Sequence, residues 1–353
     1  MAAAKGNRQV ILEGRGKVTL RDGDHVATGG EGSVYRLGDI AIKIYLDPAK
    51  MRQDDMADKV RALTALAHPY IVGPRGLVLN ERSVPIGLYM PYVEGEPFPR
   101  VFTNDYRTRS GFNDDNANTL ADRMREAVKF VHEKHAIVVD GNELSWLLVM
   151  GNGPEPRIID VDSFSIGRWP PKAIMPSIRD WHTKGFTELS DWFSWGIVSF
   201  QVYTGIHPYK GTLPGYNQGE LERRMKDNAS LFSQDIRLNR NVRDFACIPP
   251  RLLAWYVDTF QNGMREVPPS PFDAAIGVIK GAVIARTVVT ASGTLVYEKL
   301  YDNGSDPAIR IFPCGVVLLK SGRLHDLASR REIGFAKSRS NIASIVRSGI
   351  QTV

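Results

Sequence analysis

The hydrophobic and polar positions divide the chain into three parts of different texture. In the first part, short apolar runs of the kind typical of β-strands occupy residues 18–20, 34–44, 71–72, 77–79 and 86–90. One helix interrupts them, because Met56, Val60 and Leu63 follow one another at helical spacing and Pro69 restricts the chain just beyond. The pattern predicts a β-rich first part that contains one helix.

Helical spacing dominates the second part. Between residues 119 and 135 the apolar side chains fall on one helical face, which carries Leu120, Met124, Ala127, Phe130 and Val131. Short apolar runs follow at residues 137–139, 147–150 and 158–159, and a second helical region begins near Asp191. The stretch from 94 to 118 is polar and predicts no regular element.

The third part begins near residue 282. Short β-like runs occupy residues 283–289, 295–300, 309–312 and 316–319. Asn303-Gly304 and Ser321-Gly322 lie between such runs and are typical of hairpin turns. A small β-rich domain is therefore expected at the end of the chain.

Composition excludes several classes of protein. With 43% hydrophobic residues in 353, the chain can bury a core, and it has no apolar run long enough for a membrane helix. No signal peptide is evident and the two cysteines form no framework, so we expect a cytoplasmic protein without a membrane partner.

The net charge of +6 is concentrated in residues 280–353, which hold 11 Lys and Arg against 5 Asp and Glu. We interpret this part as a solvated basic surface. The alternative is a patch that meets an acidic partner or nucleic acid.

A glycine-rich segment and an isolated lysine are the strongest chemical signals. The segment ATGGEGSVY occupies residues 27–35, between two strand-like runs, and glycines allow a backbone to approach phosphates closely. Eight residues later, Lys43 stands within the apolar run AIKIY. A lysine among apolar neighbours needs a partner, such as an ATP phosphate or a carboxylate.

From this point the chain resembles the protein-kinase superfamily, over residues 18–279. Segments similar to the family's motifs follow in the family's order: IK at 42–43, HPYIV at 68–72, LYMPYVEG at 88–95, VVDGNELS at 138–145, IIDVDSF at 158–164, SDWFSWG at 190–196 and TGIHPY at 204–209. The pattern is similar to divergent bacterial or phage kinases of the eukaryotic type. We expect an α+β, two-lobed kinase-like fold with a β-rich lobe at 1–93, a mostly helical lobe at 94–279 and a small basic β-rich domain at 280–353.

The resemblance also implies roles for individual residues. ATP would lie against the glycine loop, the strand lysine and the hinge, which correspond to Gly29, Gly30, Gly32, Val34, Lys43, Met90 and Val93. Asp140 would be the base that accepts the acceptor's proton, and Asp160 would bind Mg²⁺. Asp191 would hold the backbone of the catalytic loop.

Several accessory positions depart from the family's pattern. Ser145 replaces the usual asparagine ligand of the second metal, with Asn142 as an alternative, and Asp162 replaces a glycine. We interpret Asp162 as a second metal carboxylate or as a turn residue. Lys59 stands where the helix glutamate is expected, so Asp55 or Asp58 is predicted to pair with Lys43.

One further departure lies in the second half of the kinase-like region. The segment MPS at 175–177 lacks the glutamate that would pair with Arg265.

Since Lys43, Asp140 and Asp160 are all present, we expect an active serine/threonine protein kinase that uses ATP and Mg²⁺ on a protein substrate. Tyrosine or a small-molecule hydroxyl remains open as acceptor. The alternatives are a pseudokinase that binds ATP as an interaction module, an AMP transferase on the same fold, and a nucleic-acid-binding or structural protein that acts through residues 280–353.

Overall fold

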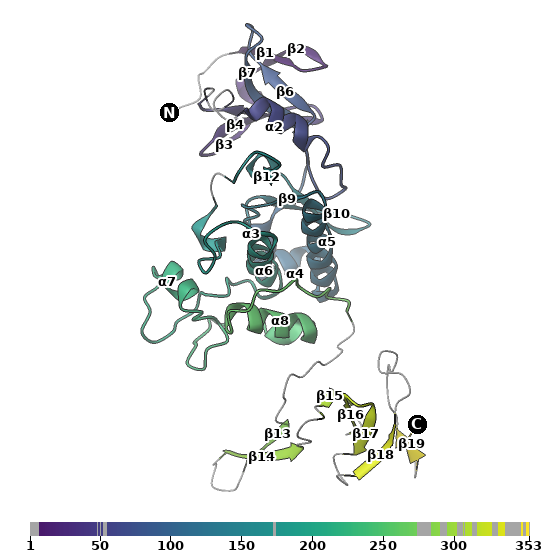
Figure 1. Ribbon diagram of the computed structural model, residues 1–353. Helices are drawn as coiled ribbons and strands as arrows, with labels where there is room; N and C mark the ends of the chain where they lie inside the picture. The colour runs from purple at the N-terminus through teal and green to yellow at the C-terminus, as the bar shows by residue number, and fades with distance from the viewer. Residues whose placement is uncertain are drawn as a thin grey trace. The chain divides into compact units, whose positions relative to one another are not determined.

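The computed structural model describes residues 7–47, 49, 51, 55–171 and 174–273, together with short segments between 284 and 352. The chain divides into two compact units, Met1–Phe272 and Asp273–Val353, and each is treated separately. The first unit mixes α and β structure, and its described residues include seven α-helices. Strands gather at one end of this unit and helices at the other (Figure 1).

A curled antiparallel sheet of seven strands forms the β-rich end. Its strands lie in the order β2-β1-β6-β7-β5-β4-β3. Their bounds are β1 Arg8–Leu12, β2 Gly16–Leu20, β3 His25–Thr28, β4 Gly32–Leu37, β5 Ile40–Tyr45, β6 Gly76–Leu79 and β7 Pro85–Pro91. The predicted strands at 18–20, 34–44, 77–79 and 86–90 are present in this sheet, whereas the run at 71–72 forms only isolated bridges. Strands β1 and β3 are additional and were not predicted.

Strand β5 lies inside the sheet, between β4 and β7, and all six of its residues are buried. Gly87 of β7 makes this close packing possible, because a Cβ at that position would come within 2.0 Å of the carbonyl oxygen of Lys43. The lysine of β5 is therefore fixed from both sides by neighbouring strands.

Helix α2, Met56–Leu63, covers one face of the sheet next to β6. Met56, Val60 and Leu63 are buried, which confirms the predicted apolar face of this helix. Lys59 lies on the same buried side and is fully inaccessible to solvent.

The helical end is built around a large apolar cluster. Its helices are α3 Phe98–Val101, α4 Asn104–Ser110, α5 Asp114–Glu133, α6 Glu188–Thr204, α7 Leu221–Lys226 and α8 Pro250–Phe260. Helix α5 begins five residues earlier than predicted, because Asn113 and Asn116 form a capping box at its start. Two short helices, α3 and α4, lie in the stretch at 94–118 that the polar pattern left without structure.

Short sheets join the two ends of the first unit. Strands β8 (Glu96–Pro97), β10 (Trp146–Gly151) and β11 (Gly153–Ile158) form one, and β9 (Ala136–Ile137) pairs with β12 (Ser165–Ile166). The loop between β9 and β10 and the segment after β11 contain the predicted catalytic aspartates. The two stretches meet where the backbone N–H of Ile159 donates a 2.9 Å hydrogen bond to the backbone oxygen of Ser145, and the segment after β11 reaches Lys43 through Asp160.

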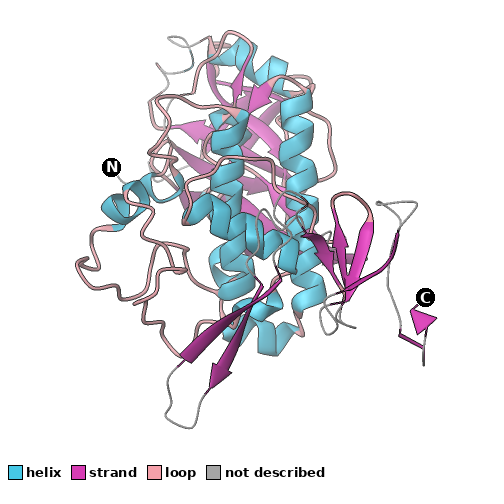
Figure 2. Ribbon diagram, turned by 60° about the horizontal axis from the view of Figure 1, so that its bottom comes forward, coloured by secondary structure: helices cyan, strands magenta, loops and turns pink. Residues whose placement is uncertain are grey.

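In the described part of the second unit, strands are the only regular elements, and they are drawn in magenta in Figure 2. They are β13 Ile284–Val289, β14 Leu295–Tyr301, β15 Ala308–Ile311, β16 Val316–Leu319, β17 Arg323–Asp326, β18 Arg331–Phe335, β19 Arg347–Ser348 and β20 Gln351–Thr352. The first four confirm the predicted strands, whereas β17 to β20 were not predicted. The turn at Asn303-Gly304 lies outside the described residues, and Ser321-Gly322 lies in the turn between β16 and β17.

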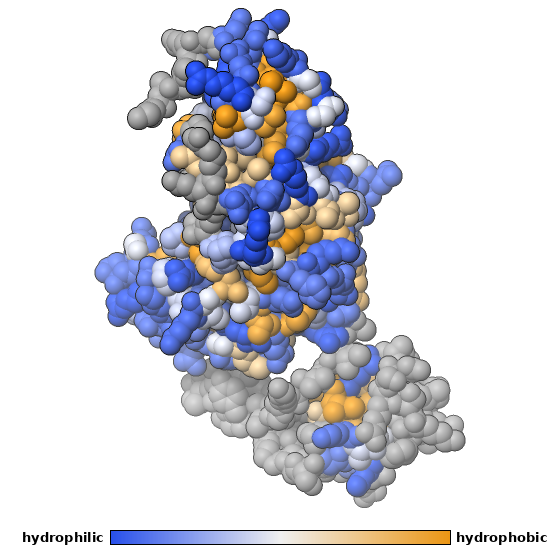
Figure 3. Space-filling model, turned by 45° about the horizontal axis from the view of Figure 1, so that its top comes forward, coloured by the Kyte–Doolittle hydropathy of each residue, from blue (hydrophilic) through white to orange (hydrophobic). Residues whose placement is uncertain are grey.

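Hydrophilic side chains cover most of the face of the first unit shown in Figure 3, with apolar residues in separate patches. In the described part of the chain, no helix combines the length and the hydrophobicity needed to cross a lipid bilayer.

Candidate active site

Lys43 meets two carboxylates that lie more than a hundred residues later in the chain. Its ammonium nitrogen, Nζ, donates hydrogen bonds to Oδ1 of Asp160 at 2.9 Å and to both oxygens of Asp162, at 3.0 and 2.9 Å. The hydroxyl of Tyr45, two residues along β5, donates to Oδ2 of Asp162 at 2.5 Å. The structure therefore brings together Lys43 of β5 and the segment after β11, as the predicted nucleotide site requires.

The two carboxylates differ in their exposure. The side chain of Asp162 is 4% exposed, whereas that of Asp160 is 55% exposed. Oδ2 of Asp160 accepts no hydrogen bond from any residue that the structure describes. Asp162 is thus a buried partner of Lys43, and Asp160 presents a carboxylate oxygen to solvent.

This arrangement shifts the pKa values of Lys43, Asp160 and Asp162. Burial alone would lower the pKa of Lys43, but the charges of Asp162 and Asp160 outweigh burial and raise it above its ordinary value. Burial alone would raise the pKa of Asp162, but Lys43 and the Tyr45 hydroxyl lower it. Desolvation and the neighbouring Asp162 raise the pKa of Asp160 against the opposing charge of Lys43. As the pH falls, Asp160 is protonated before Asp162.

The predicted pairing of Lys43 with an acid on α2 is wrong. Asp55 and Asp58 are exposed, and both lie within 3.4 Å of the guanidinium of Arg168. Lys59 instead points to the site, and its Nζ donates a 2.6 Å hydrogen bond to the backbone oxygen of Asp162. Lys43 and Lys59 can both be buried although both carry a positive charge, because Asp162 lies between them and accepts hydrogen bonds from both.

The glycine-rich segment lies between β3 and β4, where Gly32 pairs with Tyr45 of β5. A Cβ on Gly32 would lie 2.7 Å from the backbone oxygen of Ile44, so packing requires glycine there. A Cβ on Gly29 or Gly30 would meet no atom within 4 Å. Packing within the protein therefore does not explain these two glycines, which leaves the approach of a ligand as a reason for them.

Three apolar residues of the predicted ATP site lie in one cluster. Val34 on β4, Met90 on β7 and Val93 just beyond β7 pack into the apolar cluster that also contains Ala41 of β5. Val34 is paired with Lys43 across the sheet. The backbone N–H of Val93 donates to no residue within the described ranges, so it remains available to an acceptor.

Asp140 lies in a loop whose backbone is held in place by Asp191. Asp191 at the start of α6 is 3% exposed, and its carboxylate accepts hydrogen bonds from the backbone N–H groups of Val138 and Val139, at 2.6 and 2.9 Å. This is the contact that the resemblance implies for Asp191. Oδ1 of Asp140 accepts a 3.0 Å hydrogen bond from the backbone N–H of Met175, which orients the carboxylate.

The two side chains predicted as ligands of the second metal form hydrogen bonds to the backbone of their own loop. Oδ1 of Asn142 accepts a 2.8 Å hydrogen bond from the N–H of Leu144, and Oγ of Ser145 donates to the backbone oxygen of Asp140 at 3.0 Å. Both residues are buried. Both oxygens of Asp162 accept hydrogen bonds from Lys43.

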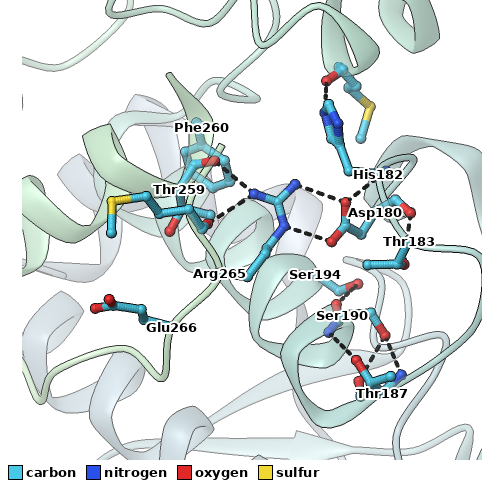
Figure 4. Close-up of polar contacts among 12 residues, drawn as sticks. Asp180, His182, Thr183, Thr187, Ser190, Ser194, Thr259, Phe260, Arg265 and Glu266 are labelled. Carbon is cyan, nitrogen blue, oxygen red and sulfur yellow. Dashed lines mark hydrogen bonds and ion pairs between the residues drawn. The ribbon is translucent and has the colours of Figure 1, made fainter. Parts of the chain in front are cut away.

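The partner of Arg265, expected to be missing, is Asp180. The guanidinium donates to both carboxylate oxygens, at 2.6 and 2.8 Å, and the Asp180 side chain is fully buried (Figure 4). The same guanidinium also donates to the backbone oxygen of Thr259. The carboxylate lies three residues beyond Ser177, where the glutamate was expected, so motif spacing alone missed it.

Two further residues were overlooked in the sequence. Nε2 of His132, near the end of α5, lies 2.9 Å from Oδ2 of Asp191, so this histidine supports the carboxylate that holds the loop of Asp140. Tyr45 was assigned only to an apolar strand. Its alternation with Lys43 along β5, which places both on one face, is the signal that could have found it.

Among described residues, no group of three or more His, Cys, Asp or Glu side chains is arranged to hold a metal ion. Mg²⁺ commonly uses one or two carboxylates together with substrate phosphates and water, and the exposed Asp160 side chain is a carboxylate of this kind. No family model matches this chain, and no curated protein matches it.

Proposed function

We propose that the first unit is a two-lobed protein-kinase-like domain that transfers the γ-phosphate of ATP to Ser or Thr hydroxyls of a protein. One observation carries this proposal: Lys43 of an inner strand bonds the solvent-facing Asp160, next to a glycine segment whose Gly29 and Gly30 have no packing role. Phosphoryl transfer depends chiefly on positioning and charge neutralisation, and these residue types provide both.

Each group would have a separate task. Lys43 would bind the α- and β-phosphates, and the N–H groups of the glycine segment would approach the phosphate oxygens. The free N–H of Val93 would bind the adenine edge beside Val34 and Met90. These contacts would place the γ-phosphate near the loop that carries Asp140.

Asp160 would bind Mg²⁺, which when present neutralises charge on the phosphate oxygens. Its exposed Oδ2 fits this task, since a metal that also binds phosphates must lie on the solvent side. Asp140, oriented by the N–H of Met175, would accept the proton of the acceptor hydroxyl.

Radiolabelled transfer tests the proposal. The full chain is incubated with Mg²⁺, ATP labelled in the γ-phosphate and a mixture of acceptor proteins, followed by analysis of the labelled amino acids. We expect label on serine and threonine with the wild type and none with Lys43→Met or Asp140→Asn. Label that is equal in all three samples, or present only on tyrosine, contradicts the proposal.

A further inference from the structure

The acid that pairs with Lys43 belongs to the segment after β11 and not to helix α2. Asp162 binds the ammonium through both of its oxygens, while the acids of α2 pair with Arg168 at the surface. Helix α2 contributes a cation instead, since the fully buried Lys59 binds the backbone oxygen of Asp162. Relative to the kinase pattern, the acid that pairs with the strand lysine lies after β11 in place of a glycine, and a lysine occupies the position of the helix glutamate.

We propose that Asp162 is the positioning residue of Lys43 and that Lys59 couples helix α2 to Asp162. This proposal rests on the proposed kinase function. It assigns Asp160 to the metal and Asp162 to the lysine, so the two aspartates of one short segment have separate partners.

The hydrogen bonds support this division. Lys43 makes one bond to Asp160 and two to Asp162. When Asp160 turns to a cation, the single bond is lost, but the two bonds to Asp162 keep the ammonium in place. Tyr45 supports the same carboxylate from β5, so Asp162 is held by donors from one rigid strand.

The burial of the residues supports the division as well. A metal bound together with ATP needs a carboxylate that solvent and phosphates can reach, and Asp160 is 55% exposed. Asp162 is 4% exposed, and its charge is compensated by the buried Lys43 beside it. A buried carboxylate with both oxygens occupied is suited to holding a side chain and not to exchanging ligands.

Lys59 extends the arrangement to α2. A buried ammonium must keep hydrogen-bond acceptors, and the backbone oxygen of Asp162 is one of them at 2.6 Å. A movement of α2 away from the site would therefore pull on the backbone of Asp162 or strip Lys59 of this bond. The position of α2 and the orientation of Asp162 are linked through Lys59, and no acidic residue of the helix takes part in this link.

The first test measures the reactivity of the Lys43 amine without nucleotide. The full chain is treated with acetic anhydride near pH 9, and acetylation of Lys43 is quantified by mass spectrometry against exposed Lys129 as an internal standard. Because Lys43 must leave its two hydrogen bonds to Asp162 before the amine can react, we expect Asp162→Asn to increase acetylation about 10-fold or more. Asp160→Asn should increase it less. Equal acetylation in wild type and Asp162→Asn overturns the proposal.

The second test measures the Mg²⁺ concentration needed for half-maximal binding of a fluorescent ATP analogue. Asp160→Asn should raise it about 10-fold or more, and Asp162→Asn should leave it near the wild-type value. A comparable rise in both variants would make Asp162 a metal ligand and overturn the proposal. A wild type that binds no nucleotide contradicts the kinase function, whereas the acetylation result still decides the partner of Lys43.

Two further variants keep the proposal testable if Asp162→Asn does not fold. Tyr45→Phe removes only the hydroxyl bonded to Asp162 and should increase acetylation of Lys43 in the same direction by a smaller factor. Lys59→Met tests the coupling, and we expect it to lower the rate of phosphoryl transfer while the Mg²⁺ requirement stays unchanged. An unchanged transfer rate in a folded Lys59→Met protein would overturn the coupling to α2.

Discussion

The carboxylate of Asp191 accepts a 2.9 Å hydrogen bond from the backbone N–H of Val139, the residue that precedes Asp140. Val139 has a φ of +66°, a left-handed conformation that is unfavourable for a β-branched residue. Such a conformation persists only where the surroundings impose it. Asp191 and its neighbour His132 are the groups that do so, and the orientation of Asp140 depends on them.

Replacing Asp191 by Asn should therefore damage both stability and activity. The variant places its amide NH2 group against one of the two backbone N–H donors, which we expect to cost about 2 to 4 kcal/mol of unfolding free energy. Phosphoryl transfer should fall more strongly than nucleotide affinity, because the loop of Asp140 loses its support. Denaturant unfolding and kinetics check both effects, with Glu188→Gln on the same helix turn as control. Equal behaviour of the two variants would contradict this role.

The glycine segment permits a matched comparison. Gly29→Ala and Gly30→Ala should leave the melting temperature unchanged, because a Cβ there meets no protein atom within 4 Å, but should weaken binding of MgATP. Gly32→Ala should lower the melting temperature, because its Cβ would lie 2.7 Å from a backbone oxygen. Thermal unfolding and nucleotide titration of the three variants check this. If binding is unaffected by Ala at both 29 and 30, the segment does not approach phosphates.

The ion pair of Arg265 and Asp180 should be a major structural contact of the helical end. Asp180→Asn leaves a largely buried guanidinium without its charged partner, and we expect a loss of about 3 kcal/mol or more. The exposed pair of Arg100 and Glu96 provides the control, since Glu96→Gln should have little effect. Urea unfolding of both variants measures the difference. Similar losses in both would mean that burial does not strengthen the Arg265 contact.

His207 should make stability depend on pH. Burial lowers its pKa to about 4, and the neutral ring donates from Nε2 to the backbone oxygen of Ser177 at 2.8 Å while Nδ1 accepts from Tyr209. The unfolded chain, with an ordinary pKa near 6.5, binds the proton more readily. The stability that the neutral, buried His207 ring contributes to the fold is therefore fully present above about pH 6.5. It is lost as the pH falls toward 4, by about 3 kcal/mol in all.

The measurement compares urea unfolding of wild type and His207→Gln at several pH values between 7 and 4. Glutamine keeps a donor but does not titrate, so the difference in stability between the two proteins should shrink as the pH falls. A difference that stays constant over this range would show that His207 is not the group responsible.

The sequence predicted those parts of the fold and site that depend on local pattern. The strands around Lys43, the apolar face of α2 and the role of Asp191 as an anchor of the loop follow from spacing and motif order. Contacts set by tertiary packing could not be predicted. Lys59 stands in place of an expected glutamate and Asp162 in place of an expected glycine, and no local signal shows that a buried lysine will bind a backbone oxygen on a distant segment.

Motif spacing failed where a substitute lies a few residues away. Asp180 replaces an expected glutamate, and the helix start at Asp114 depends on a capping box of two asparagines. The pattern of the polar stretch before α5 did not reveal α3 and α4, because α3 buries only Phe98 and Val101 and α4 has no buried residue, so neither leaves a periodic apolar pattern.

The central claim is transfer of the γ-phosphate, and the intact mass of the full chain and of an added acceptor protein tests it most directly. Both masses are measured after incubation with MgATP, beside Asp160→Ala treated identically. We predict a phosphate-sized gain on the chain or the acceptor with the wild type alone. An AMP-sized gain, or no gain on either protein although nucleotide binds, would contradict a kinase and would favour an AMP transferase or a binding module, respectively.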